Sequence, residues 1–388
     1  MNKRNLTLGK EPSKIREMFE FAKKQGNKDI FDFSIGNPSV LPPKKVDEVL
    51  ERLLKDPNVH QYTSSAGDIN VRDKIAEYLN KTYKTNIKGE FIYLTCGAAA
   101  ALAISFNALL EKDDEVISFA PYFPEYKVFI EQAGGKFVPL LCKDDMLPDL
   151  DLLEKAINER TQIVLINSPN NPTGQFYDEE IIKSISSVLK KKEKELGHPI
   201  YLVSDEPYRE LLFVDKKYPF ITNYYDNSIV CYSFSKSLSL PGERIGYVLV
   251  NPNAKEVDDV FNAIKGAGRS LGYICAPSIF QKMIPEILGC HSDFNVYIKN
   301  RDLLYKSLTE IGYEVVKPVG AFYLFMKALD SDANEFAKEA IKYNLVIVPS
   351  DTFGIKGYVR IAYCVSHETV INSIEAFRKL YERYKNER

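Results

Sequence analysis

The sequence predicts an α/β fold, in which a mostly parallel central sheet carries helices on both faces and a smaller α+β domain lies beside it. From about residue 91, short β-rich runs alternate with helix-like segments, as in a sheet covered by helices. Most of these runs are continuously apolar, which is typical of strands buried on both faces. The pattern changes after about residue 280, so we expect a large domain over residues 46–282 and a small domain formed by residues 1–45 and 283–388.

The elements of both domains follow from these patterns. The expected strands of the large domain are "FIYLTCG", "DEVISFA", "GKFVPLL", "TQIVLINSP", "PIYLVSDEP", "SIVCYSFS" and "IGYVLVN". The first leads into the apolar helix "AAAALAISFNALL", and the amphipathic helix "EEIIKSISSVLKKKEKELG" has a lysine-rich end and a Gly197 that suit a helix C-terminus. In the small domain we expect a long helical segment to about residue 310, then "YEVV", "AFYLFMK", the helix "DANEFAKEAIKYN", the strands "LVIVP" and "YVRIAYC", and a terminal helix.

The composition and net charge indicate which kinds of molecule the protein binds. The chain has 388 residues, 45% of them hydrophobic, so it can bury a large core. Lys and Arg number 51 against 53 Asp and Glu, which gives a net charge of -2 and no basic face for nucleic acid. We therefore expect small-molecule substrates or protein partners and no nucleic acid.

Cysteine usage and hydropathy predict a protein of the cytoplasm. The cysteines, at positions 96, 142, 231, 275, 290 and 364, form no C-x-x-C pair and lie near no histidine cluster, so we expect neither a metal site nor a disulfide framework. The N-terminus has no apolar signal region, and no apolar run approaches the roughly 18–20 residues of a membrane span. We expect no association with a membrane.

Polar residues follow several of the expected strands at the point where each ends. Asn171 lies in "NSPNNPTG" after one strand, Asp205 and Tyr208 lie in "SDEPY" after the next, and Lys236 lies in "SFSK" after a third. In open α/β sheets, ligands bind where the carboxyl ends of the strands meet the following loops. We therefore expect these four side chains at one rim of the sheet.

Each of these motifs also has a purely local explanation. "NNPTG" is a good turn sequence, Asp205 can be a helix N-cap, and a loop lysine such as Lys236 can be a solvated surface residue. The physics of turns and caps does not require this order at successive strand ends, however. The joint occurrence therefore favours a functional site.

The ordered set of motifs resembles a known enzyme family. "NSPNNPTG", "SDEPY", "SFSKSLSLPGERIGY" and "YVRIAYC", together with "DFSIGNPSV", "TCGAAAAL", "PYFPEY", "VGAFYLF" and "VIVPSDTFG", are similar to the pyridoxal-phosphate-dependent aminotransferases of fold type I, class I/II, which include aspartate aminotransferase. The resemblance covers nearly the whole chain, in the same order and at similar separations. It implies that the large domain binds pyridoxal 5'-phosphate.

The resemblance assigns catalytic roles to individual residues. Lys236 matches the lysine that binds the cofactor aldehyde and then moves a proton between the substrate α-carbon and the cofactor. Asp205 matches the carboxylate that pairs with the pyridine nitrogen. Tyr208 and Asn171 match the residues that hydrogen-bond the 3'-oxygen of the ring. Such a lysine works only if burial and its neighbours lower its pKa.

Other cofactor contacts are implied in the same way. Ser233, Ser235 and Arg244 match phosphate ligands, and Gly97 and Ala98 lie at an expected helix N-terminus, where free N–H groups favour a phosphate. Relatives often carry a polar side chain after that glycine, whereas Ala98 offers only its backbone. Phe123 matches an aromatic ring stacked on the cofactor, with a core aromatic residue as the alternative. Tyr62 resembles the tyrosine that reaches the phosphate from the second subunit of a homodimer.

The resemblance also assigns a few residues to substrate binding. Arg360 matches the arginine that binds the substrate α-carboxylate, and Gly36 and Asn37 resemble the turn beside it. Asn171 is also expected to bind the substrate. A structural strand arginine is the alternative for Arg360. Arg269 lies near the position of a second arginine that binds a distal carboxylate across the dimer, but the offset between the motifs is not clean.

The first functional hypothesis is transamination of an α-amino acid, such as aspartate or another common amino acid, with a 2-oxo acid such as 2-oxoglutarate. A lyase that performs β-elimination or C–S cleavage would use the same lysine, aspartate and arginines, and the sequence separates the two poorly. A binding module with a relic site is the third reading, which the intact Lys236, Asp205 and Arg360 argue against.

Overall fold

The computed structural model describes residues 1–10, 14–25 and 30–386. Its centre is a seven-stranded sheet in the order β2-β8-β7-β6-β5-β3-β4, and every pairing is parallel except those that β8 makes with β2 and β7. The mostly parallel sheet and all seven predicted strands are confirmed. The strands are β2 (Ile92–Thr95), β3 (Glu115–Ala120), β4 (Lys136–Leu141), β5 (Thr161–Asn167), β6 (Tyr201–Asp205), β7 (Ser228–Ser233) and β8 (Gly246–Val250).

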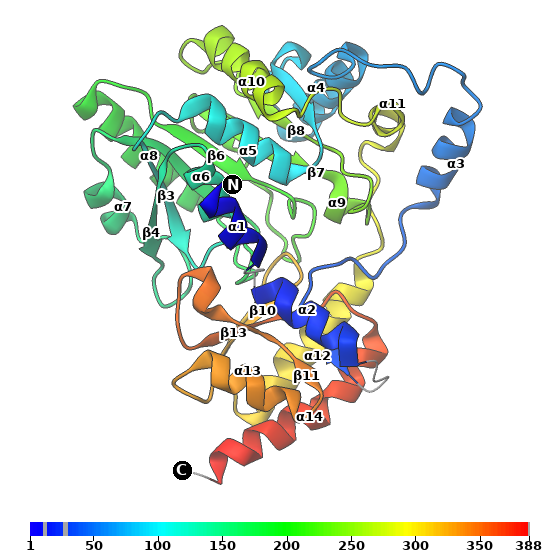
Figure 1. Cartoon of the computed structure of the whole chain (residues 1–388), viewed down its shortest axis with the longest axis vertical. Helices are drawn as coiled ribbons and strands as arrows, with labels where there is room; N and C mark the ends of the chain where they lie inside the picture. The colour runs from blue at the N-terminus through cyan, green and yellow to red at the C-terminus, as the bar shows by residue number, and fades with distance from the viewer. Residues whose placement is uncertain (11–13, 26–29, 387–388) are drawn as a thin grey trace.

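Helices cover both faces of this sheet (Figure 1). Consecutive strand residues enter different cores: Val164 and Leu202 pack in one, and Leu165 and Val203 in the other. This alternation explains why the strands read as continuous apolar runs. One face packs against α5 (Ala98–Leu109), α6 (Glu125–Gln132) and α10 (Val257–Leu271), and the other against α3 (Lys44–Leu53), α4 (Ile69–Tyr83), α7 (Leu150–Ala156), α8 (Glu179–Leu196) and α11 (Ser278–Ile287).

Both ends of α8 carry local capping residues, and the predicted role of Gly197 at its C-terminus is confirmed. Asp178 caps its N-terminus by accepting a hydrogen bond from the backbone N–H of Ile181, and Gly197 follows its C-terminus with a left-handed φ of 78°.

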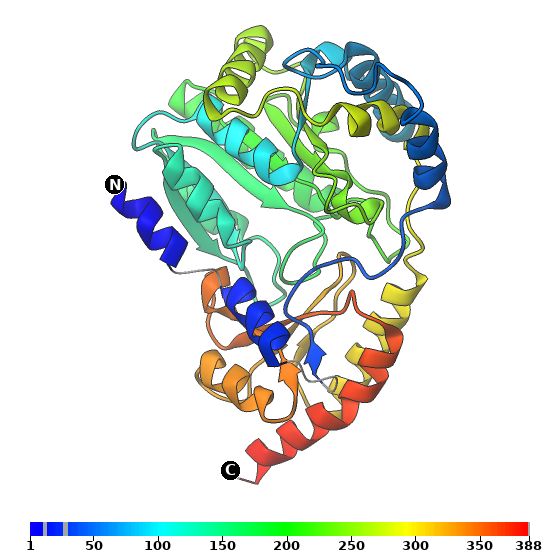
Figure 2. The ribbon, with the colours of Figure 1, turned by 45° about the vertical axis from the view of Figure 1, so that its right-hand side comes forward.

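A second, smaller sheet lies at the other end of the molecule (Figure 2). Its strands are antiparallel in the order β12-β13-β10-β9, and a separate parallel pair joins β1 to β11. The strands are β1 (Phe31–Asp32), β9 (Val315–Val316), β10 (Tyr323–Lys327), β11 (Leu345–Val346), β12 (Val348–Pro349) and β13 (Tyr358–Ala362), and the helices are α1 (Lys3–Lys10), α2 (Lys14–Gln25), α12 (Asn295–Ile311), α13 (Ala333–Ile341) and α14 (His367–Lys385). The N-terminal part of the chain therefore pairs with the C-terminal part through β1 and β11. Arg4 in α1 contacts α6 by donating to the carbonyl of Val128.

Two expectations for this part of the chain are wrong. The long helical segment to residue 310 is two helices, α11 and α12, because the chain leaves the helix at Leu288 and Gly289 adopts a φ of 82°. "LVIVP" is not one strand: Ile347 separates β11 from β12, which belong to different sheets.

The division into two domains stays a prediction, and we propose one adjustment to it. The expected boundary between residues 282 and 283 lies inside α11, whose Met283, Ile284 and Ile287 are buried in the core of the large sheet. We place the boundary after this helix, in the segment that joins α11 to α12.

Candidate active site

The predicted site residues follow strands whose carboxyl ends lie at one edge of the central sheet. Strands β2, β5, β6 and β7 all run in the same direction, since the two antiparallel contacts of β8 restore the direction of β2. Gly97 follows β2, Asn171 follows β5, Asp205 ends β6, and Lys236 lies in α9 (Phe234–Ser237), the single turn after β7. These four positions therefore meet at one rim of the sheet. The sequence predicts Asn171, Asp205 and Lys236 there, together with Tyr208 in the loop after β6.

A cavity of about 270 Å³ opens at this rim. It is lined by Ile15, Ile35, Gly36, Ala98, Ala99, Leu102, Phe123, Asn167, Asn171, Asp205, Pro207, Tyr208, Ser233, Ser235, Lys236, Pro241, Arg244, Tyr323 and Arg360. The structure thus brings together all the predicted site residues except Gly97, which borders the cavity behind Arg244, and Tyr62, Arg269 and Asn37, which are absent from its lining.

Lys236 presents its amine to this cavity. Ser233 caps the turn that carries it, by accepting a hydrogen bond from the backbone N–H of Ser235. The Nζ atom donates a hydrogen bond of 2.6 Å to the carbonyl oxygen of Gly36. The pKa of Lys236 is lowered to about 8, mainly by burial; Cys364 opposes this shift, and the positive charges of Arg244 and Arg360 contribute to it. An amine with this pKa is partly unprotonated near neutral pH and can act as a nucleophile or base.

Asp205 is buried with one carboxylate oxygen satisfied and one free. Tyr126 donates a hydrogen bond of 2.6 Å to Oδ2, and Asn167 donates one of 2.9 Å to the backbone carbonyl of Asp205. Oδ1 has no hydrogen-bond partner among the described residues, although it is fully buried. Burial raises the pKa of Asp205 to about 7, against the lowering effect of the Tyr126 hydrogen bond.

Arg360 lines the cavity and is only 1% exposed. It donates hydrogen bonds to Asn171 Oδ1, at 3.0 Å, and to the carbonyl of Ser34. Its guanidinium lies 4.6 Å from the ring centre of Tyr323 and 5.2 Å from that of Phe353. Its Nε has no partner among the described residues, so the group keeps donor capacity. Burial lowers the pKa of Arg360 from its ordinary value.

A polar corner lies between α9 and the start of α5. Ser233 Oγ and Ser235 Oγ are 2.7 Å apart, and Arg244 donates from Nη1 to Ser235 Oγ at 3.4 Å. Gly97 has a φ of 82°, and a Cβ at this position would lie 2.8 Å from Arg244 Nη2. The glycine therefore lets α5 begin with its free N–H groups beside the arginine, an arrangement that favours an anion.

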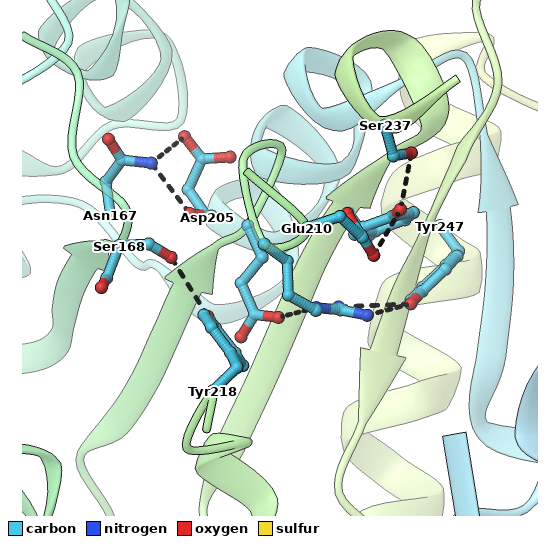
Figure 3. A network of polar contacts seen from close by, with 10 residues as sticks. Asn167, Ser168, Asp205, Glu210, Tyr218, Ser237 and Tyr247 are labelled. Carbon is cyan, nitrogen blue, oxygen red and sulfur yellow. Dashed lines mark hydrogen bonds and ion pairs between the residues drawn. The ribbon is translucent and has the colours of Figure 1, made fainter. Parts of the chain in front are cut away.

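A buried ionic network supports the loop that follows β6 (Figure 3). Arg209 donates to Glu206 Oε2 at 2.7 Å, and both side chains are at most 1% exposed. Its two terminal nitrogens also donate to the hydroxyl of Tyr247, at 3.2 and 3.3 Å. The guanidinium lies 4.3 Å from the ring centre of Tyr232, within the range of a cation–π interaction.

The same network reaches the turn that carries Lys236. Tyr232 donates to Glu210 Oε1 at 3.0 Å, and its hydroxyl lies 3.0 Å from Ser237 Oγ. Glu210 and Ser237 are thus linked through one buried hydroxyl. This arrangement ties the position of α9 to the loop between β6 and Leu211.

Tyr62 and Arg269 lie on the surface of the chain. Tyr62 is 96% exposed and Arg269 is also exposed, in the last turn of α10. Their two segments adjoin, because Cys275 donates from its backbone to the carbonyl of Ser65. These two segments and their neighbours also expose four large apolar side chains, those of Tyr62, Ile69, Tyr273 and Ile274.

Several residues of the cavity were not predicted from the sequence. Asn167 and Tyr323 line the cavity and lie in motifs of the family resemblance, which gave neither of them a role. Tyr126 lies outside the lining and contacts Asp205, and an aromatic residue in an apolar run is typical of a core. Isolated apolar residues such as Ile15 and Leu102 carry no signal of their own. Only the packing of α2 and α5 around the rim shows that these two side chains face a ligand-sized cavity.

The described residues offer neither a metal-binding cluster nor a membrane-spanning helix. Over residues 1–10, 14–25 and 30–386, no group of three or more His, Cys, Asp or Glu side chains could hold a metal ion. Within the same ranges, no helix combines the length and the hydrophobicity needed to cross a membrane. The six cysteines, all described, are free thiols.

Comparison with known proteins identifies the class of enzyme. The profile of aminotransferase class I and II matches residues 28–377. The aspartate aminotransferase of Pyrococcus horikoshii is 32% identical, over 96% of this chain and 95% of that protein. An aminotransferase structure from Eubacterium rectale is 49% identical with a TM-score of 0.97, over 99% of both chains. Aspartate aminotransferase from Thermus thermophilus with maleate is 26% identical with a TM-score of 0.86, over 98% of this chain and 99% of that one.

The chain therefore belongs to the aminotransferase class I and II family. It is a transaminase of amino acids that depends on pyridoxal 5'-phosphate and has the α/β fold of aspartate aminotransferase. The predictions of family, fold class, enzyme class and cofactor are confirmed. The roles of the individual site residues are not tested by these comparisons.

Proposed function

We propose that this transaminase exchanges the amino group between aspartate and 2-oxoglutarate in the cavity at the rim of the central sheet, with Lys236 as the reactive amine. Pyridoxal phosphate supplies an aldehyde and a ring that accepts electrons. Lys236 would hold the aldehyde covalently and afterwards carry a proton to and from the substrate α-carbon. The observation that carries the proposal is the pairing of a lysine of lowered pKa with a buried carboxylate in one cavity.

The residues of the cavity fit the cofactor. Asp205 Oδ1 is buried without a hydrogen-bond partner among the described residues. A pyridinium N–H of the cofactor would supply the missing donor. At the other end, Arg244, Ser233, Ser235 and the N–H groups of α5 form a corner suited to phosphate. We assign Asp205 to the ring nitrogen, Tyr208 and Asn171 to the 3'-oxygen, and Phe123 to the face of the ring.

Arg360 is proposed to bind the α-carboxylate of every substrate. Its guanidinium is held by Asn171 and by the Ser34 carbonyl near Gly36, and its unpartnered Nε supports a further contact. A rigid, permanently charged fork in a dry site suits a carboxylate.

The names of the relatives support aspartate as the donor, since several are called aspartate aminotransferase. The cationic side chains in the described lining of the cavity are Lys236, Arg244 and Arg360, and each has a role already. A distal carboxylate would therefore be bound by a group from outside this lining. We propose that Arg269 of a second subunit provides it.

A symmetric homodimer would bring Arg269 of one subunit to the cavity of the other. Tyr62 and Arg269 lie on adjoining surface segments that also expose Ile69, Tyr273 and Ile274. Apolar exposure of this kind favours association with a second copy, which would bring Tyr62 to the phosphate and Arg269 to the substrate of the partner. The free cysteines support a reducing compartment, and we propose the cytoplasm.

A panel of amino donors tests this proposal. The purified holoenzyme is mixed with aspartate, glutamate, alanine, leucine or phenylalanine, in the absence of any oxo acid, and the loss of the cofactor absorbance is followed. We expect aspartate to react fastest and Lys236→Ala to give no change with any donor. An unchanged spectrum with aspartate, while another donor reacts, would refute the assignment of the substrate.

A further inference from the structure

Tyr323 touches two residues to which the proposed function gives a role, Tyr208 and Arg360, and also packs against Gly36. Its hydroxyl lies 2.9 Å from the hydroxyl of Tyr208, and its ring centre lies 4.6 Å from the guanidinium carbon of Arg360. A Cβ on Gly36 would lie 2.0 Å from the Tyr323 hydroxyl, so that hydroxyl is packed directly against the Gly36 backbone. Tyr323 is 3% exposed and lines the cavity.

The register of the small sheet brings these groups together. β10 and β13 are antiparallel, and Phe325 lies opposite Arg360 while Tyr323 lies opposite Ala362. Tyr323 and Phe325 are two residues apart and therefore share a face of the sheet, so Tyr323 reaches Arg360 as its diagonal neighbour. Tyr208 approaches from the large sheet. The contact thus crosses from one sheet to the other.

The two hydroxyls have a defined protonation. Burial raises the pKa of Tyr208 well above its usual range and that of Tyr323 to about 12, so both groups are neutral at physiological pH. Each can donate one proton and accept another. If Tyr208 donates to the 3'-oxygen of the cofactor, the proton between the two tyrosines belongs to Tyr323.

We propose that Tyr323 is a positioning residue that joins the two halves of the site: its hydroxyl orients and polarises Tyr208 toward the cofactor, and its ring holds the guanidinium of Arg360 for the substrate carboxylate. This inference rests on the proposed roles of Tyr208 and Arg360. The two effects come from different parts of one side chain, so two substitutions separate them.

Tyr323→Phe removes only the hydroxyl. Without a donor to its oxygen, Tyr208 becomes a weaker donor to the cofactor, so the pH midpoint at which the absorbance of the bound cofactor changes should rise. We expect an increase of about 0.5 pH unit without substrate, which is the effect of one lost neutral hydrogen bond. The KM for amino acids should stay within about twofold, because the ring still faces Arg360.

Tyr323→Leu removes the ring as well. We expect the KM for every amino donor to rise about fivefold beyond that of Tyr323→Phe, the effect of losing a cation–π contact on a buried guanidinium. Tyr358→Leu is the matched control, since Tyr358 stacks on Phe325 on the same strand pair and does not line the cavity. It should leave both the midpoint and the KM as in the wild type.

The pH midpoint and the KM values test the two proposed roles of Tyr323 separately. A midpoint that stays or falls in Tyr323→Phe overturns the role of the hydroxyl, and equal KM values in Tyr323→Leu and the control overturn the role of the ring. Unfolding of the apoenzyme variants in urea shows whether a loss comes from the fold. Failure of the proposed function looks different: the wild type itself would then show no titrating cofactor band, or would show the same band after Lys236→Ala.

Discussion

Tyr126 donates a hydrogen bond of 2.6 Å to one oxygen of Asp205 and leaves the other oxygen buried without a partner among the described residues. The described residues therefore satisfy only one oxygen of this buried carboxylate. Burial favours its protonated form, which is why its pKa rises to about 7. A cationic ring nitrogen would reverse this preference, since an opposite charge favours the ionised form.

Asp205→Asn should therefore act in opposite directions on the apoenzyme and the holoenzyme. In the apoenzyme the folded pKa of about 7 exceeds the ordinary value of 3.8, so the folded state binds the proton more tightly and the free energy of unfolding falls as pH rises between these values. Above this range the variant apoenzyme should be more stable than the wild type by up to about 4 kcal/mol, at about 1.4 kcal/mol per unit. The stabilisation that the cofactor adds should shrink, and turnover should fall more than tenfold.

Urea unfolding of both forms, measured below and above the folded pKa, checks this prediction. Tyr126→Phe is the matched variant, because it keeps the carboxylate and removes its donor. A wild-type apoenzyme whose stability does not fall with rising pH relative to Asp205→Asn would contradict the raised pKa.

Lys236→Ala should abolish turnover while the protein still binds the cofactor weakly. Borohydride should fix the cofactor on the wild-type protein at Lys236, and peptide mass spectrometry should locate it there. Lys216→Ala is a suitable control, since Lys216 lies in an exposed ion pair with Asp178. Activity of Lys236→Ala close to that of the wild type would end the proposed mechanism.

The two substrate arginines should differ in selectivity. Arg360→Ala should raise the KM of every amino acid, because all carry the α-carboxylate that this buried guanidinium would bind. Arg269→Ala should weaken aspartate and glutamate by roughly 2–5 kcal/mol in kcat/KM, through the loss of one partner of a desolvated charge pair, and should change alanine little. Equal losses for all donors with Arg269→Ala would indicate a structural role instead.

The prediction for Arg269 requires that the protein forms a dimer. Sedimentation of the holoenzyme should show a species of twice the chain mass, and Tyr62→Ala should weaken cofactor binding only if subunits pair. Mixing Tyr62→Ala with Lys236→Ala subunits should regenerate some activity, because one of the two composite sites in a mixed dimer would be intact. A monomer that stays active on dilution rules out shared sites.

Arg209→Met should destabilise the fold rather than alter the chemistry directly. It leaves Glu206 as an unpaired buried charge, at a cost of about 3–5 kcal/mol in the free energy of unfolding. Arg52→Met breaks an exposed pair with Glu286 and should cost less than about 1 kcal/mol. A double change, Glu206→Gln with Arg209→Met, should recover part of the loss. Urea unfolding of the apoproteins distinguishes these cases, and a loss for Arg209→Met no larger than that of Arg52→Met would contradict the account.

Much of the fold could be predicted from local signals. Each strand of the central sheet is an apolar run flanked by turn residues, and Asp178 and Gly197 mark the ends of α8. The rim residues that follow the strands, Asn171 and Lys236 among them, could be predicted because strand order places them together. "LVIVP" could not be divided correctly, since only pairing with β1 and β13 decides where one strand stops.

The rest of the site depends on contacts between distant segments. Tyr323 and Tyr208 are 115 positions apart, and their contact follows from the way the small sheet packs on the large one. Tyr126 reads as a helix core residue until its hydroxyl is seen at Asp205. The substrate-binding role of Arg269 rests on a motif whose spacing does not match the family closely, and in a single chain Arg269 lies on the surface.

The most direct test of the central claim is a stoichiometry. The holoenzyme is mixed with excess aspartate and no oxo acid, and both 2-oxo acid and ammonia are measured against the number of cofactor-loaded chains. A transaminase that holds its proton-transfer chemistry at Lys236 should release one 2-oxo acid per loaded chain, stop, and resume when 2-oxoglutarate is added. Continuous release of ammonia without an acceptor, as a lyase would give, would contradict the account.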